Sequence, residues 1–132
     1  MAENVMDHIV AEFRTSATKY YPQNGEVKNV RIVGHTPKTE HFIYDVVVDF
    51  ETRSERLAAK VYRAGKAGQQ AAKNLARTES TNLDHAHSLF VKKGFEGIPR
   101  PLGDFSEYGA VVSEKFVGVP LQSIIMKGAL LP

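Results

Sequence analysis

The spacing of hydrophobic positions changes from a helical to a strand pattern after about residue 26. Apolar residues recur at four-residue steps in the first segment: Val5, Ile9, Phe13 and Ala17. This spacing predicts an amphipathic helix over residues 4–20. Residues 42–50 (FIYDVVVDF) are rich in β-branched and aromatic side chains and, with residues 27–34 and 57–63, predict three consecutive strands. The short segments between these strands predict antiparallel neighbours.

The second half of the chain predicts one long helix followed by two further extended segments. The helix covers residues 69–93, and Gly94 stands where a glycine commonly ends a helix. Residues 97–102 are extended, with two prolines that favour the edge of a sheet, and residues 110–116 form the last strand. The pattern predicts an α+β fold: a five-stranded antiparallel sheet, a long helix packed on it and an N-terminal helix.

Composition and charge narrow the class of protein without identifying it. The 132 residues are 42% hydrophobic and 24% charged, with a formal net charge of +2, which is typical of one globular domain. The absence of cysteine excludes disulfides, thiolate metal sites and cysteine nucleophiles. The apolar runs fall short of the roughly 20 residues that span a bilayer, and the N-terminus lacks a signal-peptide pattern. We therefore expect a cytoplasmic protein without a membrane partner.

Two charged segments could indicate nucleic-acid binding or metal binding, and we favour neither function. Residues 53–77 contain seven basic residues and one acid, which is compatible with nucleic-acid binding. Tyr62 is the sole aromatic residue in that segment, so we expect a solvated face with local neutralisation and no nucleic-acid partner. Asp84 and His87 lie one helical turn apart, but two ligands without a third predict no metal site.

Lys60 and Glu79 are charged residues in apolar surroundings. Lys60 lies in the third predicted strand among small and apolar residues, and Glu79 lies between Leu75 and Leu83 on the apolar stripe of the long helix. A carboxylate that faces a core costs several kcal/mol unless it is paired. We therefore predict an ion pair that leaves the ammonium able to contact phosphate. In the alternative, Glu79 is solvated at the helix edge and Lys60 extends to water.

Four sequence segments together resemble a known family. They are LAAKVYR (57–63), ARTESTNL (76–83), GIPRPLGDF (97–105) and VVSEKFVGVPL (111–121). Their order and spacing resemble the N-terminal lobe of the aminoglycoside phosphotransferase and choline kinase family, which is protein-kinase-like. The resemblance extends over about residues 27–125. It implies a nucleotide-binding lobe over residues 27–119, preceded by a helical segment (1–26) and followed by the start of an inter-lobe helix (120–132).

The resemblance implies a role in ATP binding for eight residues. These are Lys60 and Glu79 at the phosphates, Ser113, Glu114 and Lys115 in the hinge, and Ala58, Val33 and Val112 around the adenine. In the hinge, the Ser113 carbonyl and the Lys115 amide would bond the adenine. The first hairpin, residues 34–40, would cover the phosphates. It departs from the family pattern because it has one glycine and contains Pro37, which lacks an amide proton.

The same resemblance implies that catalysis needs residues outside this chain. The family's H-x-D-x-x-x-x-N loop and metal-binding Asp belong to a C-terminal lobe, and this sequence contains neither, so we expect no catalytic residue and no metal ligand here. The expected function is ATP binding, with Mg2+ and a small-molecule hydroxyl acceptor in a longer kinase, and no phosphoryl transfer by this chain alone. A severed lobe is also expected to self-associate. The alternative is a non-catalytic α+β interaction module that keeps the lobe shape and binds a protein.

Overall fold

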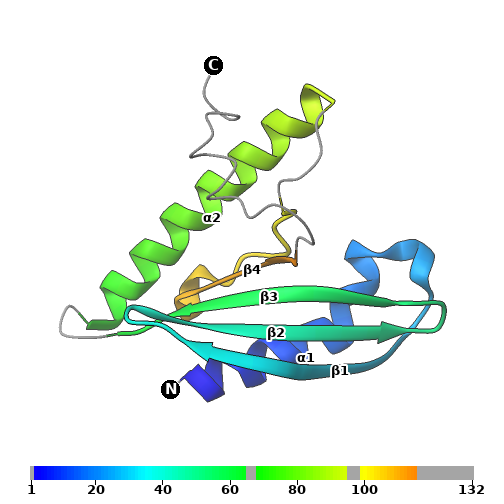
Figure 1. The fold of residues 1–132 in the computed structure, drawn as a ribbon, viewed down its shortest axis with the longest axis horizontal. Helices are drawn as coiled ribbons and strands as arrows, with labels where there is room; N and C mark the ends of the chain where they lie inside the picture. Colours follow the sequence, from blue (N-terminus) through cyan, green and yellow to red (C-terminus); the bar gives the residue numbers. More distant parts are fainter. Residues whose placement is uncertain (1, 65–67, 95–98, 116–132) are drawn as a thin grey trace.

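The computed structural model describes residues 2–64, 68–94 and 99–115 (Figure 1). Its elements are α1 (Ala2–Tyr20), the 3-10 turn η1 (Pro22–Asn24), β1 (Val27–Pro37), β2 (His41–Phe50), β3 (Ser54–Tyr62), α2 (Gly68–Lys92), the 3-10 turn η2 (Ser106–Tyr108) and β4 (Ala110–Glu114). The predicted α+β class and the helices predicted over residues 4–20 and 69–93 are confirmed. The start of an inter-lobe helix, implied for residues 120–132, lies outside the described residues.

The described residues form a sheet of four antiparallel strands in the order β1-β2-β3-β4, and the predicted fifth strand is not confirmed. The expected extra strand is reduced to an isolated bridge between Pro101 and Ser113. The Leu102 amide donates to the Val112 carbonyl, and Gly103 at φ +75° then turns the chain away. At the other edge of the sheet, β1 continues to Pro37 opposite Phe42, beyond its predicted end.

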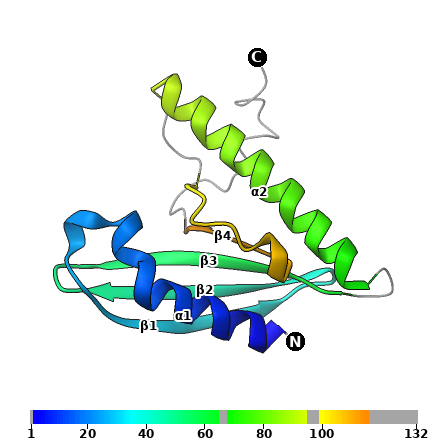
Figure 2. The same cartoon turned by 180° about the vertical axis from the view of Figure 1, so that it is seen from behind.

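One face of the sheet is covered by α1, as Figure 2 shows from behind. The helix contributes Met6, Ile9, Phe13 and Ala17 to the core, and the strands contribute Val46, Val48, Leu57, Ala59 and Val112. This core contains three of the four α1 residues that the helical spacing identified, namely Ile9, Phe13 and Ala17. Met6 takes the fourth place, and Val5 is half-buried at the margin of the core. Because side chains alternate along a strand, Lys60 and Ala58 point to the opposite face.

The second helix, α2, lies on the face opposite α1 and rises away from the sheet (Figure 1). Its buried residues are Ala72, Ala76 and Phe90. Leu75, expected on the buried stripe, is 51% exposed, because α2 presents Ala72 and Ala76 to the rest of the fold. Gly94 has φ +78°, which confirms the predicted helix end. Within the described ranges, neither helix combines the length and apolarity needed to cross a membrane.

Candidate functional site

Lys60 and Glu79 form an ion pair between β3 and α2. The Lys60 Nζ lies 2.8 Å from the Glu79 Oε1, and the side chains are 28% and 34% exposed. The Tyr62 hydroxyl donates a hydrogen bond to the same carboxylate oxygen, and the Lys60 ammonium lies 5.1 Å from the Tyr62 ring centroid. Alternation along β3 places Lys60 and Tyr62 on one face, and α2 brings the carboxylate to them. The predicted pairing is therefore present, with Tyr62 as an additional member.

The electrostatics of this cluster fix its protonation state at neutral pH. Burial lowers the pKa of Lys60, but the hydrogen bond and charge of Glu79 outweigh it, so the net pKa lies above the ordinary lysine value. Burial and the hydrogen bond to Glu79 both raise the pKa of Tyr62. Lys60 is consequently a fixed cation, and Tyr62 remains a neutral hydrogen-bond donor. A cation held in this way suits an anionic ligand such as phosphate.

A surface groove of about 620 Å³ runs beside this cluster. It is lined by Tyr62, Ala71, Asn74, Leu75, Thr78, Glu79 and Asn82. The groove therefore follows one side of α2 and reaches the carboxylate of the ion pair. Its lining combines amide and hydroxyl groups with the exposed Leu75, a composition that suits a polar ligand or a peptide.

The three hinge residues lie in β4 and at its end, where several of their polar groups already have partners. The Lys115 amide donates to the Arg56 carbonyl at 2.8 Å, so this amide is already bonded within the sheet, whereas the resemblance implied that it would bond the adenine. Ser113 stands opposite Ala58 in the antiparallel ladder. Both backbone positions are thus held by pairing with β3.

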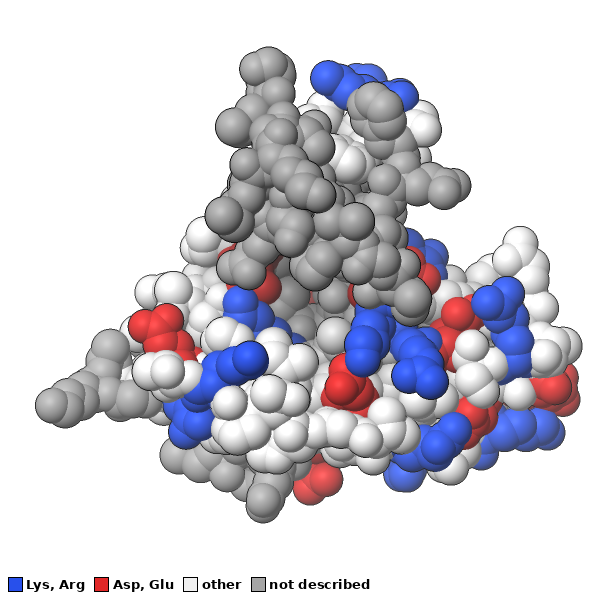
Figure 3. All heavy atoms as spheres, in the orientation of Figure 1, with Lys and Arg blue, Asp and Glu red and all other residues white. Residues whose placement is uncertain are grey.

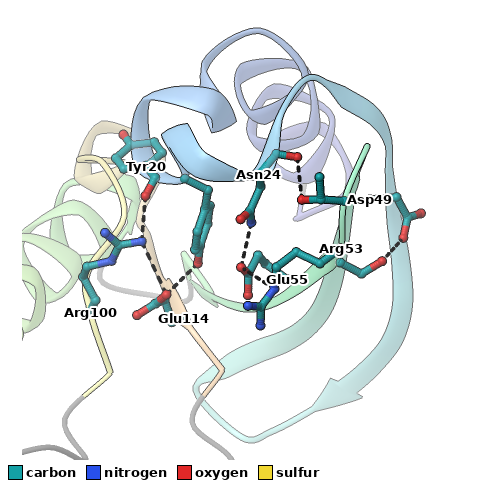
Figure 4. A network of polar contacts seen from close by, with 10 residues as sticks. Tyr20, Asn24, Asp49, Arg53, Glu55, Arg100 and Glu114 are labelled. Carbon is teal, nitrogen blue, oxygen red and sulfur yellow. Dashed lines mark hydrogen bonds and ion pairs between the residues drawn. The ribbon is translucent and has the colours of Figure 1, made fainter.

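The Glu114 side chain belongs to a different network, on the α1 side of the sheet. Its Oε2 accepts hydrogen bonds from the Tyr21 hydroxyl at 2.7 Å and from the Arg100 guanidinium at 3.4 Å. Arg100 also donates to the Tyr20 carbonyl at 3.0 Å (Figure 4). Burial, then the hydrogen bond and charge of Glu114, raise the pKa of Tyr21 above its ordinary value. Glu114 therefore connects β4 to the end of α1 through hydrogen bonds, and its carboxylate points away from Lys60.

The three residues expected around the adenine do not gather in one place. Ala58 shares the face of β3 that carries Lys60. Val112 is 2% exposed and packs in the core on the α1 face, so it does not line a slot beside Ala58. Val33 lies at a register shift of β1 between Ile32 and Gly34 and is 49% exposed. The structure thus brings together Ala58, Lys60 and Glu79 from the predicted set.

The turn of the first hairpin contains no glycine, in contrast to the glycine-rich loops that cover phosphates. Its turn consists of residues 38–40, and the Lys38 amide donates to the His41 carbonyl at 2.8 Å. Gly34 lies within β1, away from the turn, where a Cβ atom would meet an Asp45 carboxylate oxygen at 2.7 Å. The glycine therefore allows a close approach of Asp45, and the turn itself does not use it.

Asp45 was not identified from the sequence, although it is part of the same sheet face. Its Oδ1 lies 3.0 Å from the Lys115 Nζ, with side chains that are 30% and 40% exposed. A sequence signal exists, because Asp45 is an acid inside an apolar strand and stands opposite Ala58. The Tyr21–Glu114–Arg100 network carries no such signal, because its members are distant along the chain.

Several of the remaining charged residues are paired with one another. Across the part of the chain that the structure describes, no three His, Asp or Glu side chains converge as metal ligands. In the basic segment, Arg53 pairs with Glu55, and Lys73 and Arg77 pair with Glu107. Positive and negative side chains are interspersed on the face seen in Figure 3.

No family model, curated protein or solved structure matches this chain.

Proposed function

We propose that this chain binds ATP as the N-terminal lobe of an aminoglycoside-phosphotransferase-like kinase. The observation that carries the proposal is the 2.8 Å ion pair between Lys60 of β3 and Glu79 of α2. Protein kinases hold ATP with a strand lysine that pairs with a helix glutamate in this way. In the proposal, Lys60 contacts the phosphates and Glu79 orients Lys60.

The order of the elements adds support. A strand with the lysine, a helix with the acid, a proline-containing segment and then a further strand follow one another along the chain. The last of these, β4, pairs with β3, which puts its end near Ala58 on the same face as Lys60. A base that stacks on Ala58 would then place its phosphates toward Lys60, two residues further along β3.

The chemistry assigned to this chain is positioning and charge neutralisation. Phosphoryl transfer needs a base that accepts the proton of the acceptor hydroxyl and Mg2+ ligands that bridge the phosphates. In the proposal these groups belong to a C-terminal lobe, together with the site for a small-molecule acceptor. We therefore expect the 132-residue chain to bind ATP without transferring its γ-phosphate.

A second candidate is a non-catalytic interaction module, and two observations favour it. The β1–β2 turn, residues 38–40, lacks the glycines that let backbone amides approach phosphates. The Lys115 amide, expected to bond the base, is occupied by the Arg56 carbonyl. In this candidate the groove along α2, with Leu75 at its surface, would bind a protein segment.

Equilibrium titration of the chain with MgATP distinguishes these candidates. We expect saturable binding, weakened about tenfold by Lys60→Met, because a charge-assisted hydrogen bond to phosphate is lost. Glu79→Ala should also weaken binding, because Lys60 then loses its orientation. The dissociation constants of the two variants should agree within about a factor of three. Lys73→Met is the matched control, since Lys73 lies on α2 and pairs with Glu107 at 3.9 Å.

Circular dichroism of each variant checks that the fold is kept. Absence of saturable MgATP binding, or equal affinity in all four proteins, would overturn the proposal and favour the interaction module.

A further inference from the structure

The Lys115–Asp45 ion pair connects two strands that are not neighbours in the sheet. Lys115 follows β4, whereas Asp45 lies in β2, and β3 lies between these strands. Adjacent strands are about 4.8 Å apart, so the two side chains together span close to 10 Å. With Nζ and Oδ1 at 3.0 Å, the lysine side chain has to cross β3 on the face that carries Ala58 and Lys60.

The residues around this ion pair are small enough to let it lie flat on the sheet. Asp45 stands opposite Gly34 on one side and opposite Ala58 on the other. A Cβ atom at Gly34 would meet the Asp45 carboxylate at 2.7 Å, so only glycine gives the carboxylate this room. Ala58 likewise has a single methyl group beneath the pair. The sheet surface at Ala58 therefore has room for a planar group, and the ion pair occupies this room.

We propose that the Lys115–Asp45 pair is a removable cover over the nucleobase position at Ala58. This inference rests on the proposed ATP-binding function, since that function assigns the base to Ala58. A planar base and the lysine side chain cannot occupy the same surface. The base therefore binds when the pair opens, and the pair competes with the nucleotide without touching the Lys60–Glu79 cluster.

The pair suits such a role because it is easily opened. Its side chains are 40% and 30% exposed, and ion pairs with this exposure are weak because water solvates and screens the separated charges. The free energy of such a pair corresponds to a change in affinity of about two- to fivefold. Removing the pair should therefore tighten nucleotide binding by that factor.

The test compares two doubly substituted chains of unchanged net charge. Asp45→Asn with Lys115→Met removes the cover. Lys28→Met with Glu51→Gln is the matched control, because it removes an exposed pair of 3.6 Å elsewhere on the protein. The probes are ATP and adenosine, titrated separately and followed by calorimetry or by ligand-detected NMR. Adenosine has no phosphate, so it reports on the base position without Lys60.

We expect the first double variant to bind both probes about two- to fivefold more tightly than the wild type and the control. Binding of adenosine by this variant alone would also support the cover. If ATP binds in a Lys60-dependent way but all three proteins have equal affinities, the cover is overturned and the proposed function stands. If neither probe binds to any of the folded proteins, both the cover and the proposed function are overturned.

Discussion

At the scale of single residues, Tyr21 has a role that its position in the chain does not suggest. It follows α1 directly, is 9% exposed, and donates its hydroxyl proton to Glu114 at the end of β4. The Arg100 guanidinium lies 4.9 Å from its ring centroid and also bonds Glu114. One phenol thus connects the N-terminal helix, the segment before β4 and β4 itself.

Replacing this phenol should change the alkaline stability of the protein. Burial and Glu114 raise the pKa of Tyr21, so the folded state holds its proton more tightly than the unfolded state. The resulting stability is complete below the ordinary tyrosine pKa of about 10 and is lost as the pH rises above it. We expect Tyr21→Phe to lower the free energy of unfolding by about 1–2 kcal/mol at pH 7 and by less at pH 11. Urea titrations at both pH values measure this difference, and a constant difference would contradict it.

Gly34 provides a second test at the residue scale. An alanine Cβ at this position would lie 2.7 Å from the Asp45 Oδ2 and 3.3 Å from its Cβ, so the side chain of Asp45 has to move. We expect Gly34→Ala to cost about 1 kcal/mol, because crowding outweighs the gain from replacing glycine in a strand. In combination with Asp45→Ala the cost should largely disappear. Additive effects in this double-mutant cycle, measured by urea unfolding, would refute the close approach.

At the scale of elements, the prolines after α2 protect one edge of the sheet. Leu102 donates to Val112, and the Arg100 carbonyl accepts from Glu114, so both residues face β4. Pro101 lies between them and faces the outside, where its missing amide proton offers nothing to another strand. The prolines therefore leave the existing bonds to β4 intact and block pairing beyond them.

Replacing Pro101 should thus affect association more than folding. We expect Pro101→Thr to change the free energy of unfolding by less than about 1 kcal/mol, because no ladder bond is lost. The new outward amide should increase concentration-dependent association through the exposed edge. Sedimentation velocity over a concentration series measures this effect. The same association in Thr36→Ser, a mild change in β1 at the opposite edge, would rule out a specific role for the proline.

How far the sequence predicts the elements depends on how local their signals are. Spacings of two and four residues locate α1, β2, β3 and α2 correctly, because each pattern lies within one element. Lys60 and Glu79 are predictable as a pair because each is a charge in an apolar run. The rotation of α2 about its own axis is not predictable from such a pattern. Ala72 and Ala76 are buried because α2 packs against η2 and β4 with this side, and Leu75 is therefore exposed. The occupied Lys115 amide depends on the register of β4 against β3, which no local pattern gives.

At the scale of the whole molecule, α1 and the Lys60–Glu79 cluster lie on opposite faces of one sheet. The core beneath α1 includes Phe13, which is fully buried and lies 5.8 Å, between ring centroids, from both Tyr20 and Phe105. The site has few buried apolar groups of its own. Its geometry therefore depends on a core that lies on the other side of the strands.

Loss of the Phe13 ring should accordingly unfold the molecule as a unit. We expect Phe13→Ala to cost about 3–5 kcal/mol, a large part of the 5–15 kcal/mol typical of a domain. Leu75→Ala, at a 51% exposed position, should change stability by less than about 0.5 kcal/mol. Thermal unfolding followed by circular dichroism compares the two variants. Near-equal losses would show that the α1 core does not support the sheet.

The sequence separation of the two polar clusters has a consequence for how the protein folds. Lys60 and Glu79 are 19 residues apart, whereas Tyr21 and Glu114 are 93 apart. Strands β1 to β3 are joined by short hairpins, so the meander and α2 can form while only small loops are closed. Pairing of β4 with β3 closes a longer loop that contains α2, and the bond from Tyr21 to Glu114 closes a segment of 93 of the 132 residues. Folding should therefore begin with the meander, and substitutions at Tyr21 should speed unfolding while leaving the folding rate almost unchanged.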